Sequence, residues 1–413
     1  MKAAITHAMS GFAWLSYSET ERRKALDVLA MFRERDTRDE LGIGVIRDAF
    51  ADLFFPGTST IQTRARYFLF IPWIYQRLER KRVRSVEIAE RARREEVALI
   101  EGLCDSGEKD GVIGIEARKN LRRLPSSVYW QGLAQWGLRL FPGSIDQYHR
   151  SLDRFYLNGA RVIKNDDGEP IDGFVRRNWH AALPPRPENF PEGATMRLSN
   201  KEADYLREQV LAEAPESFLA FLLNDAKPAE QSSFPWMHPQ HSSLSQRIKE
   251  QLLHARNFSE TLHGAALLYN FLLAKQAKAK KLTQDYEKKL HDWSLVIAAA
   301  ERRLSAWDRS RFWDLVIHDG RARLRNQTKQ FVDTWVDFVL AGCAPTATSN
   351  KKVHTLIQAR ERTLKRAQSR FDNPRALELW GGAAGTNQLD YRWDQVQTIV
   401  ADIQAGARES SRA

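Results

Sequence analysis

The residues of this sequence whose types and spacing best indicate a chemical role are arginines that lie among hydroxyl and amide side chains. That role is the binding of anionic groups. Arg64 and Arg66 occur in "TSTIQTRARYF", and "RARLRNQTKQ", which begins at residue 321, carries three more. A guanidinium group binds phosphate oxygens through paired hydrogen bonds. Both stretches therefore predict contacts with a nucleic-acid backbone. The residues predicted to bind nucleic acid are Thr63, Arg64, Arg66, Tyr129, Gln131, Arg321, Arg323 and Arg325.

The role of the first arginine pair depends on the elements around it. The sequence "FPG" at 55–57 ends one helix and a hydroxyl residue at 58–60 caps the next, which places the pair in the first turns of a helix. Unpaired N–H groups at that end and the two arginines would together hold a phosphate oxygen. In the alternative interpretation, these arginines pair with Asp48 or Asp52 of the preceding helix while "YFLFIPWI" enters the core.

The stretch "NLRRLPSSVYWQGLAQWGLR" has the layout of the second half of a helix-turn-helix motif. A turn and cap at 125–127 place Tyr129 and Gln131 at the start of the following helix, where residues that read DNA bases lie. Many sequences are compatible with this geometry, so a second interpretation stays open. In that interpretation, Trp130 and Trp136 belong to the core rather than to a base-stacking surface.

Catalytic patterns are sparse. The sequence has no phosphate-binding Gly-Lys-Thr loop, no dinucleotide fingerprint and no nucleophile elbow. In "DGVIGIEARK", Asp110 and Glu116 resemble part of a nuclease centre, but Arg118 occupies the position where that centre has a lysine. A divergent metal-dependent nuclease that uses carboxylates such as Asp110, Glu116 or Asp167 is the enzymatic alternative. The interpretation that the sequence favours is a protein without catalytic residues and without a cofactor.

The histidine spacing does not predict a metal site. His238 and His241 flank Pro239, which makes a histidine pair on one helix face unfavourable. Glu260 and His263 supply one Glu-x-x-His motif, which is half of a carboxylate-bridged di-iron pair, and the second half is missing. We therefore expect no bound metal.

Apolar residues at three- and four-residue spacing predict helices through most of the chain. The clearest break is "LPPRPENFPEGA", whose prolines exclude a regular helix and favour an extended connector. We expect a mainly α protein of two helical domains, 1–183 and 198–405, joined by a Pro-rich linker at 184–197 and followed by a flexible tail at 406–413. Two Asp-Gly pairs among β-branched residues in 158–179 predict a small β-hairpin in the first domain. This hairpin could belong to a winged-helix-like element.

Two predicted helices of the second half carry further signals. The stretch "LSNKEADYLREQVLAEA" opens with Ser199 and has Glu202 three residues later, which is the spacing of a capping box. The stretch "ARNFSETLHGAALLYNFLLA" is strongly apolar, and Gly264 with the two alanines that follow it permits close approach of a neighbouring helix. We expect this helix to form the core of the second domain.

The charge balance favours a polyanionic partner. Lys+Arg 63 against Asp+Glu 52 gives a net charge of +11. Residues 1–183 have 30 basic and 25 acidic residues, or +5, and the remainder has 33 and 27, or +6, so neither half is a basic tail. An ordinary arginine-rich bacterial surface would have the same composition, and that interpretation stays open.

The cysteines and the hydropathy of the sequence indicate the cellular compartment of the protein. The two cysteines lack any CxxC context, so neither a disulfide framework nor a zinc ribbon is supported, and a reducing cytosol fits. The apolar run "YFLFIPWIY" is well short of the roughly 20 residues needed to cross a bilayer. We therefore expect a cytoplasmic protein without membrane contact.

Several blocks together resemble a bacterial family of unknown function, DUF6361. They are "FAWLSYS", "DELGIGVIRDAFADLFFPGTSTIQTRARYFLFIPWI", "LPSSVYWQGLAQWG", "ARNFSETLHGAALLYN" and "LELWGGAAGTNQLDYRW", and they span nearly the whole chain. Members of this family are often encoded beside helicases and phospholipase-D-like proteins in defence regions. The resemblance therefore implies a role in anti-phage defence and a helicase or phospholipase-D-like protein as complex partner. It supplies no catalytic residues.

The function expected from the sequence is a non-enzymatic component of a bacterial anti-phage defence system. Such a component would bind DNA or dock on a helicase or nuclease partner, and its basic composition favours nucleic acid. The alternatives are the divergent metal-dependent nuclease and a structural adaptor whose tryptophan-rich surface contacts protein.

Overall fold

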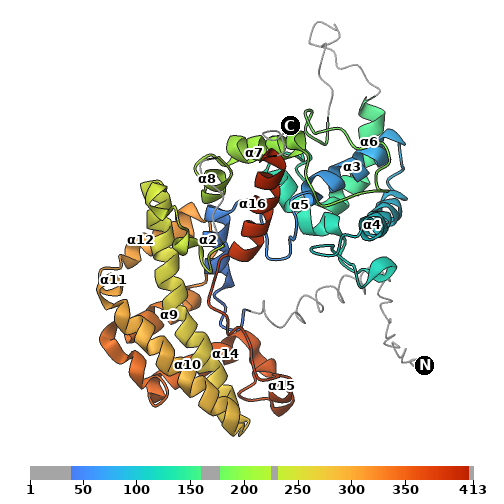
Figure 1. Cartoon of the computed structure of the whole chain (residues 1–413). Coiled ribbons are helices and arrows are strands. Elements are labelled where there is room, and N and C mark those ends of the chain that lie inside the picture. Colours follow the sequence, from blue (N-terminus) through green and yellow to red (C-terminus); the bar gives the residue numbers. More distant parts are fainter. Residues whose placement is uncertain (1–38, 160–176, 225–230, 409–413) are drawn as a thin grey trace, which may run out of the picture.

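The computed structural model describes residues 39–159, 177–224 and 231–408, and the chain is predominantly helical there (Figure 1). Apart from one isolated antiparallel bridge between Arg139 and Trp179, these residues contain no β-pairing. The mainly helical fold class is confirmed. The predicted β-hairpin and winged-helix-like element depend on residues 160–176, which lie outside the described residues.

The helices are short to medium in length, with one exception of 31 residues, α9. Before the Pro-rich segment the chain forms α2 (Gly44–Phe54), α3 (Tyr67–Arg80), α4 (Ile88–Asp105), α5 (Pro125–Gln135) and α6 (Ile145–Gly159). After it come α7 (Asn200–Glu213), α8 (Phe218–Asn224), α9 (Gln246–Gln276), α10 (Lys280–Ala299), α11 (Glu301–Ser305), α12 (Arg309–Asp314), α13 (Asn326–Phe338), α14 (Lys351–Lys365), α15 (Pro374–Glu378) and α16 (Trp393–Arg408).

The apolar run at the centre of the first half forms the core of its helix group. Every residue from Tyr67 to Tyr75 in α3 is buried, because α4 and α5 pack on this helix and the Pro-rich segment covers another part of it. Phe190 of that segment contacts the rings of Phe70 and Trp73. Within the described residues, no helix has both the length and the apolar character needed to cross a bilayer.

The second half is organised around α9, which lies beside α10 (Figure 1). A Cβ atom on Gly264 of α9 would lie 2.2 Å from the ring of Trp293 in α10. The close approach predicted for this glycine is therefore confirmed. The capping box at the start of α7 is confirmed as well, since Ser199 and Glu202 each accept a hydrogen bond from the other's backbone N–H.

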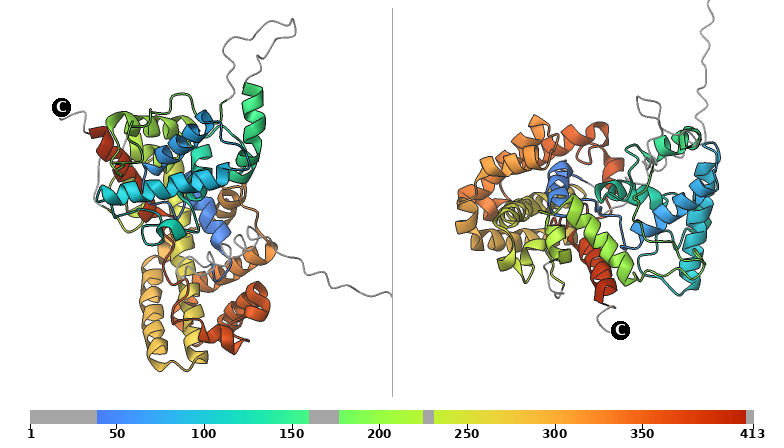
Figure 2. Two further views of the ribbon diagram at one scale, coloured as in Figure 1. Left: turned by 90° about the vertical axis from the view of Figure 1, so that its right-hand side faces the viewer. Right: turned by 90° about the horizontal axis from the view of Figure 1, so that it is seen from above.

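The first and last helices of the described chain, α2 and α16, each contact the other half of the chain. Near the start, α2 packs on α8 and α9 (Figure 1). At the end, α16 packs along α7 and α8, and its Asp402 contacts the segment before α3 (Figures 1 and 2). The buried hydrophobic residues of both halves belong to one continuous cluster. The division into two domains at residues 184–197 is therefore not confirmed. Residues 406–408 of the predicted tail belong to α16, and 409–413 lie outside the described residues.

A buried carboxylate positions the start of α5. Glu96 of α4 is fully buried, and its Oε2 accepts a hydrogen bond of 2.8 Å from the backbone N–H of Ser126 in the first turn of α5. This bond satisfies one of the N–H groups that a helix start leaves unpaired. Burial raises the pKa of Glu96 to about 7.

Glu96 is expected to make stability depend on pH. The folded protein holds the proton more tightly than the unfolded chain, so this contribution is complete below pH 4.5 and is lost as pH rises to about 7. Glu96→Gln should remove this loss and stabilise the protein by up to about 3 kcal/mol above pH 7. Urea unfolding between pH 5 and 8 measures it, with the exposed Glu101→Gln on the same helix as control. Parallel curves for Glu96→Gln and the wild type would contradict the assignment.

Candidate functional site

Arg64 is held by an acid from the far end of the chain. It precedes α3 rather than lying in its first turns, and its Nε and Nη2 donate to the carboxylate of Asp402 in α16 at 2.9 and 2.8 Å. The backbone N–H of Ala65 donates to the same carboxylate at 2.9 Å. Hydrogen bonding to Asp402 raises the pKa of Arg64. The guanidinium group therefore joins α16 to the start of α3.

Arg66 is the N-cap residue of α3 and is also paired. Its guanidinium donates to Glu202 of α7 at 2.9 Å and to the carbonyl oxygen of Thr195 at 2.9 Å. The expected pairing with acids is thus present, but the partners are not Asp48 or Asp52. Those two carboxylates contact Arg392, at 3.4 and 2.6 Å.

Thr63 and Tyr129 form a hydrogen-bonded unit inside the protein. The fully buried hydroxyl of Tyr129 accepts from the backbone N–H of Thr63 at 2.9 Å and donates to the carbonyl oxygen of Arg64 at 2.8 Å. The Thr63 hydroxyl donates to the carbonyl oxygen of Gly111 at 2.6 Å. Tyr129 therefore has no exposed side chain with which to read a base. The helix that contains it starts at Pro125 itself, after a single 3-10 turn at Arg118–Asn120.

The second arginine stretch has a different environment. Residues 321–325 run without helix into α13, and their side chains alternate: the three arginines are exposed, whereas Ala322 and Leu324 pack against the core. Arg325 has extended dihedral angles, φ −82° and ψ 140°, as the N-cap of α13. No ion pair to these arginines occurs among residues 39–159, 177–224 and 231–408. We call residues 321–325 the arginine segment.

One end of the arginine segment borders a pocket of about 510 Å³, into which Gln131 also projects from α5. Two of the residues predicted from the sequence, far apart in the chain, thus line one pocket. We call it the Gln131–Arg321 pocket. Its complete lining is Asp52, Leu53, Pro56, Gly57, Thr58, Ser59, Gln62, Val128, Gln131, Gly132, Gln135, Asp319, Gly320 and Arg321.

The turn at 56–59 forms one wall of this pocket because it packs closely on α5. Trp136 donates through its Nε1 to the carbonyl oxygen of Pro56 at 2.8 Å, and a Cβ on Gly57, whose φ is +81°, would lie 2.4 Å from that nitrogen. The amide of Gln62 is occupied, since it donates to the carbonyl oxygen of Gly57 and accepts from the N–H of Ser59. Gln131 and Gln135, which are exposed, are the amides available to a ligand.

The acids of the Gln131–Arg321 pocket have basic partners outside it. Asp52 contacts Arg392 at 2.6 Å, and Asp319 contacts Arg311 at 3.6 Å. Arg321 therefore contributes the positive charge of the pocket that no acid within the described residues offsets. The sequence gave no sign of this pocket.

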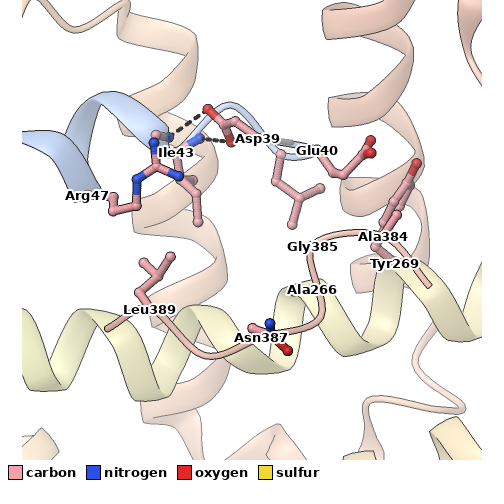
Figure 3. A pocket seen from close by; sticks show the side chains of 12 residues that line it. Asp39, Glu40, Ile43, Arg47, Ala266, Tyr269, Ala384, Gly385, Asn387 and Leu389 are labelled. Atoms are coloured by element: carbon pink, nitrogen blue, oxygen red, sulfur yellow. Dashed lines mark hydrogen bonds between the residues drawn. The ribbon is translucent and has the colours of Figure 1, made fainter. Parts of the chain in front are cut away.

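A smaller pocket of about 80 Å³ lies between the start of the described chain, α9 and the loop before α16 (Figure 3). Asp39 accepts hydrogen bonds from the N–H groups of Ile43 and Gly44 at 2.7 and 2.6 Å, and Asn387 lies on the opposite loop. The size of this pocket limits it to a small group. Beside it, Glu40 and Tyr269 belong to a buried charge network that sequence inspection did not identify.

The residues of the enzymatic and metal alternatives are dispersed. No group of three or more His, Cys, Asp or Glu side chains within the described ranges could hold a metal ion. His254 accepts a hydrogen bond from the indole of Trp307 at 2.9 Å, and His263 is 3.1 Å from the carbonyl oxygen of Thr386. Asp110 and Glu116 are exposed. Asp167 lies outside the described residues.

Comparison with known proteins places the chain in a family without indicating an activity. The model of a family of unknown function, DUF6361, matches residues 9–406. No significant match is found among curated proteins or among solved structures. Since the match extends over almost the full length, from before α2 into the last turn of α16, this chain is a member of the DUF6361 family.

Proposed function

We propose that this protein is a non-enzymatic, nucleic-acid-binding component of a bacterial anti-phage defence system, and that the arginine segment carries the phosphate contacts. The observation that supports this most is the exposure of Arg321, Arg323 and Arg325 along one short stretch without helix, with no acidic partner in the described chain. Arg321, whose φ is +51°, begins the stretch at a turn. The Cα atoms of residues two positions apart are at most about 7 Å apart, so the three exposed arginines lie in a short row. Such a row can follow consecutive phosphate groups.

The binding mode that fits this surface uses contacts to the phosphate backbone of the nucleic acid rather than to its bases. Every tryptophan within the described residues is buried, so none of these rings is available to stack on a base. Arg64 and Arg66 are occupied by Asp402 and Glu202, which leaves the arginine segment as the leading contact. Contacts made only to phosphate are independent of sequence and weaken strongly with salt. The adjoining amides Gln131 and Gln135 are placed to hydrogen-bond a sugar or a base edge.

Replacing the three arginines of the segment by alanine should weaken binding of a fluorescent oligodeoxythymidylate about tenfold or more at low salt. Losing three phosphate contacts should also reduce the slope of log affinity against log salt by about 2. Fluorescence anisotropy over a salt series measures both, for single-stranded and duplex DNA. The matched control replaces Lys280, Lys281 and Lys288, exposed on α10, and removes the same charge.

The two variants together separate a local site from general basicity. Equal losses in the arginine and lysine variants would show that the net charge, rather than the arginine segment, attracts DNA. Absence of binding to either DNA by the wild type at low salt would refute the proposal. In cells, the defence role requires that the arginine variant lose phage protection in a plaque assay while the lysine variant keeps it.

A further inference from the structure

One groove of the structure is not used by the proposed function. It is formed by α9, the end of α10 and α11, and its volume is about 560 Å³. Three arginines line it (Arg256, Arg302 and Arg303), with Glu260 and an aliphatic wall that includes Val296 and Ala299. We call it the α9–α11 groove.

The charge of the α9–α11 groove is positive. Three arginines and one glutamate give +3 − 1 = +2. Glu260, which is only 7% exposed, is already paired with Arg256 at 2.7 Å and with Arg303. Arg302 is exposed and makes no ion pair with the rest of the described chain. The groove therefore has an excess of positive charge that an acidic ligand would neutralise.

The wall of the groove is aliphatic and exposed. Val296 is 51% exposed, and Leu295 beside it in α10 is 57% exposed. The lining contains no aromatic ring on which a base could stack, which is the usual anchor for single-stranded nucleic acid. A ligand that uses the whole surface must supply an aliphatic group for the wall and carboxylates for the arginines. A protein segment that contains leucine among acidic residues meets both requirements.

We propose that the α9–α11 groove is the docking site for an acidic, leucine-containing segment of a partner protein. The leucine packs on Val296 and Ala299, and the flanking carboxylates pair with Arg302 and Arg256. Aliphatic burial and the ion pairs both contribute to the affinity, and the ion pairs also determine specificity and the rate of association. The groove and the arginine segment share no residue, so this docking is separable from binding of nucleic acid.

The test uses a fluorescent peptide of alternating leucine and glutamate and a counterpart in which glutamine replaces each glutamate. The full-length protein should bind the acidic peptide at least tenfold more tightly than its counterpart. Arg302→Glu and Val296→Asp should each reduce that binding tenfold or more. The matched control is Arg375→Glu, an exposed arginine of α15 without an ion pair in the described chain, which should bind as the wild type does.

Circular dichroism and thermal unfolding test whether the variants remain folded, and Arg302→Glu changes an exposed side chain. The proposal is overturned if the two peptides bind equally, if neither binds, or if Arg375→Glu weakens binding as much as Arg302→Glu. It is also overturned if oligodeoxythymidylate displaces the peptide from the arginine-segment variant, because the groove would then be a general polyanion site. DNA binding by the arginine segment is measured separately, because the groove contains none of its residues.

Discussion

Replacing Glu361 by leucine is expected to lower the free energy of unfolding by about 3–5 kcal/mol. This carboxylate of α14 is fully buried, and it accepts hydrogen bonds from the backbone N–H of Arg370 at 2.8 Å and from the hydroxyl of Ser369. It also lies 3.7 Å from Lys365 and 3.4 Å from the hydroxyl of Tyr269. Without it, three donors lose an acceptor and the buried network keeps a positive charge that is no longer balanced.

A double variant distinguishes the unbalanced charge from the loss of packing. Glu361→Leu combined with Lys365→Met removes one charge of each sign, so it should recover much of the lost stability. Guanidinium unfolding of the wild type, both single variants and the double variant gives the coupling energy. A loss below about 1 kcal/mol for Glu361→Leu would show that the network contributes little. Equal losses in the single and double variants would assign the effect to the hydrogen bonds of Ser369 and Arg370 instead.

Replacing Gly264 by alanine is expected to cost about 3 kcal/mol or more, although alanine ordinarily favours a helix by about 1 kcal/mol over glycine. The new methyl group would lie 2.2 Å from the indole ring of Trp293. That ring cannot move away easily, because it is buried and its Nε1 donates to the carbonyl oxygen of Glu260 at 2.8 Å. The steric effect therefore exceeds the gain in helix propensity.

Removing the ring is the control for this substitution. Trp293→Leu alone should destabilise the protein by creating a cavity, but in that background Gly264→Ala should cost little or become favourable. The change in melting temperature of the four proteins measures the coupling. If Gly264→Ala is as costly without the ring as with it, the contact between α9 and α10 is not the cause.

Local patterns in the sequence predicted most of the helices and several of their ends. The capping box at Ser199 and the apolar face of α9 each depend on residues within a turn or two of one another, so they can be read from spacing alone. The start of α3 was predicted too early, at 58–60 instead of Tyr67. The hydroxyl residues there serve a turn that packs on Trp136, a contact between positions 80 residues apart.

The candidate site could be predicted only in part, because an arginine's partner is decided by packing. Arg64 and Arg321 are both arginines in polar, basic stretches, and nothing local separates them. The structure places Asp402, 338 residues away, against Arg64 and leaves Arg321 exposed beside the Gln131–Arg321 pocket. Two arginines in similar local sequences therefore have opposite environments: Arg64 is paired and Arg321 is exposed.

By itself, the sequence determined that this protein is mainly helical, basic in both halves, and a member of the DUF6361 family. These properties depend on composition and on contacts within a few residues. Only the tertiary structure decided which arginines are paired and which grooves exist: Asp402 of α16 binds Arg64, and the turn after α2 meets α5 and Arg321 at the Gln131–Arg321 pocket. Ion pairs between distant segments depend on the packing that places those segments side by side, so no local spacing encodes them.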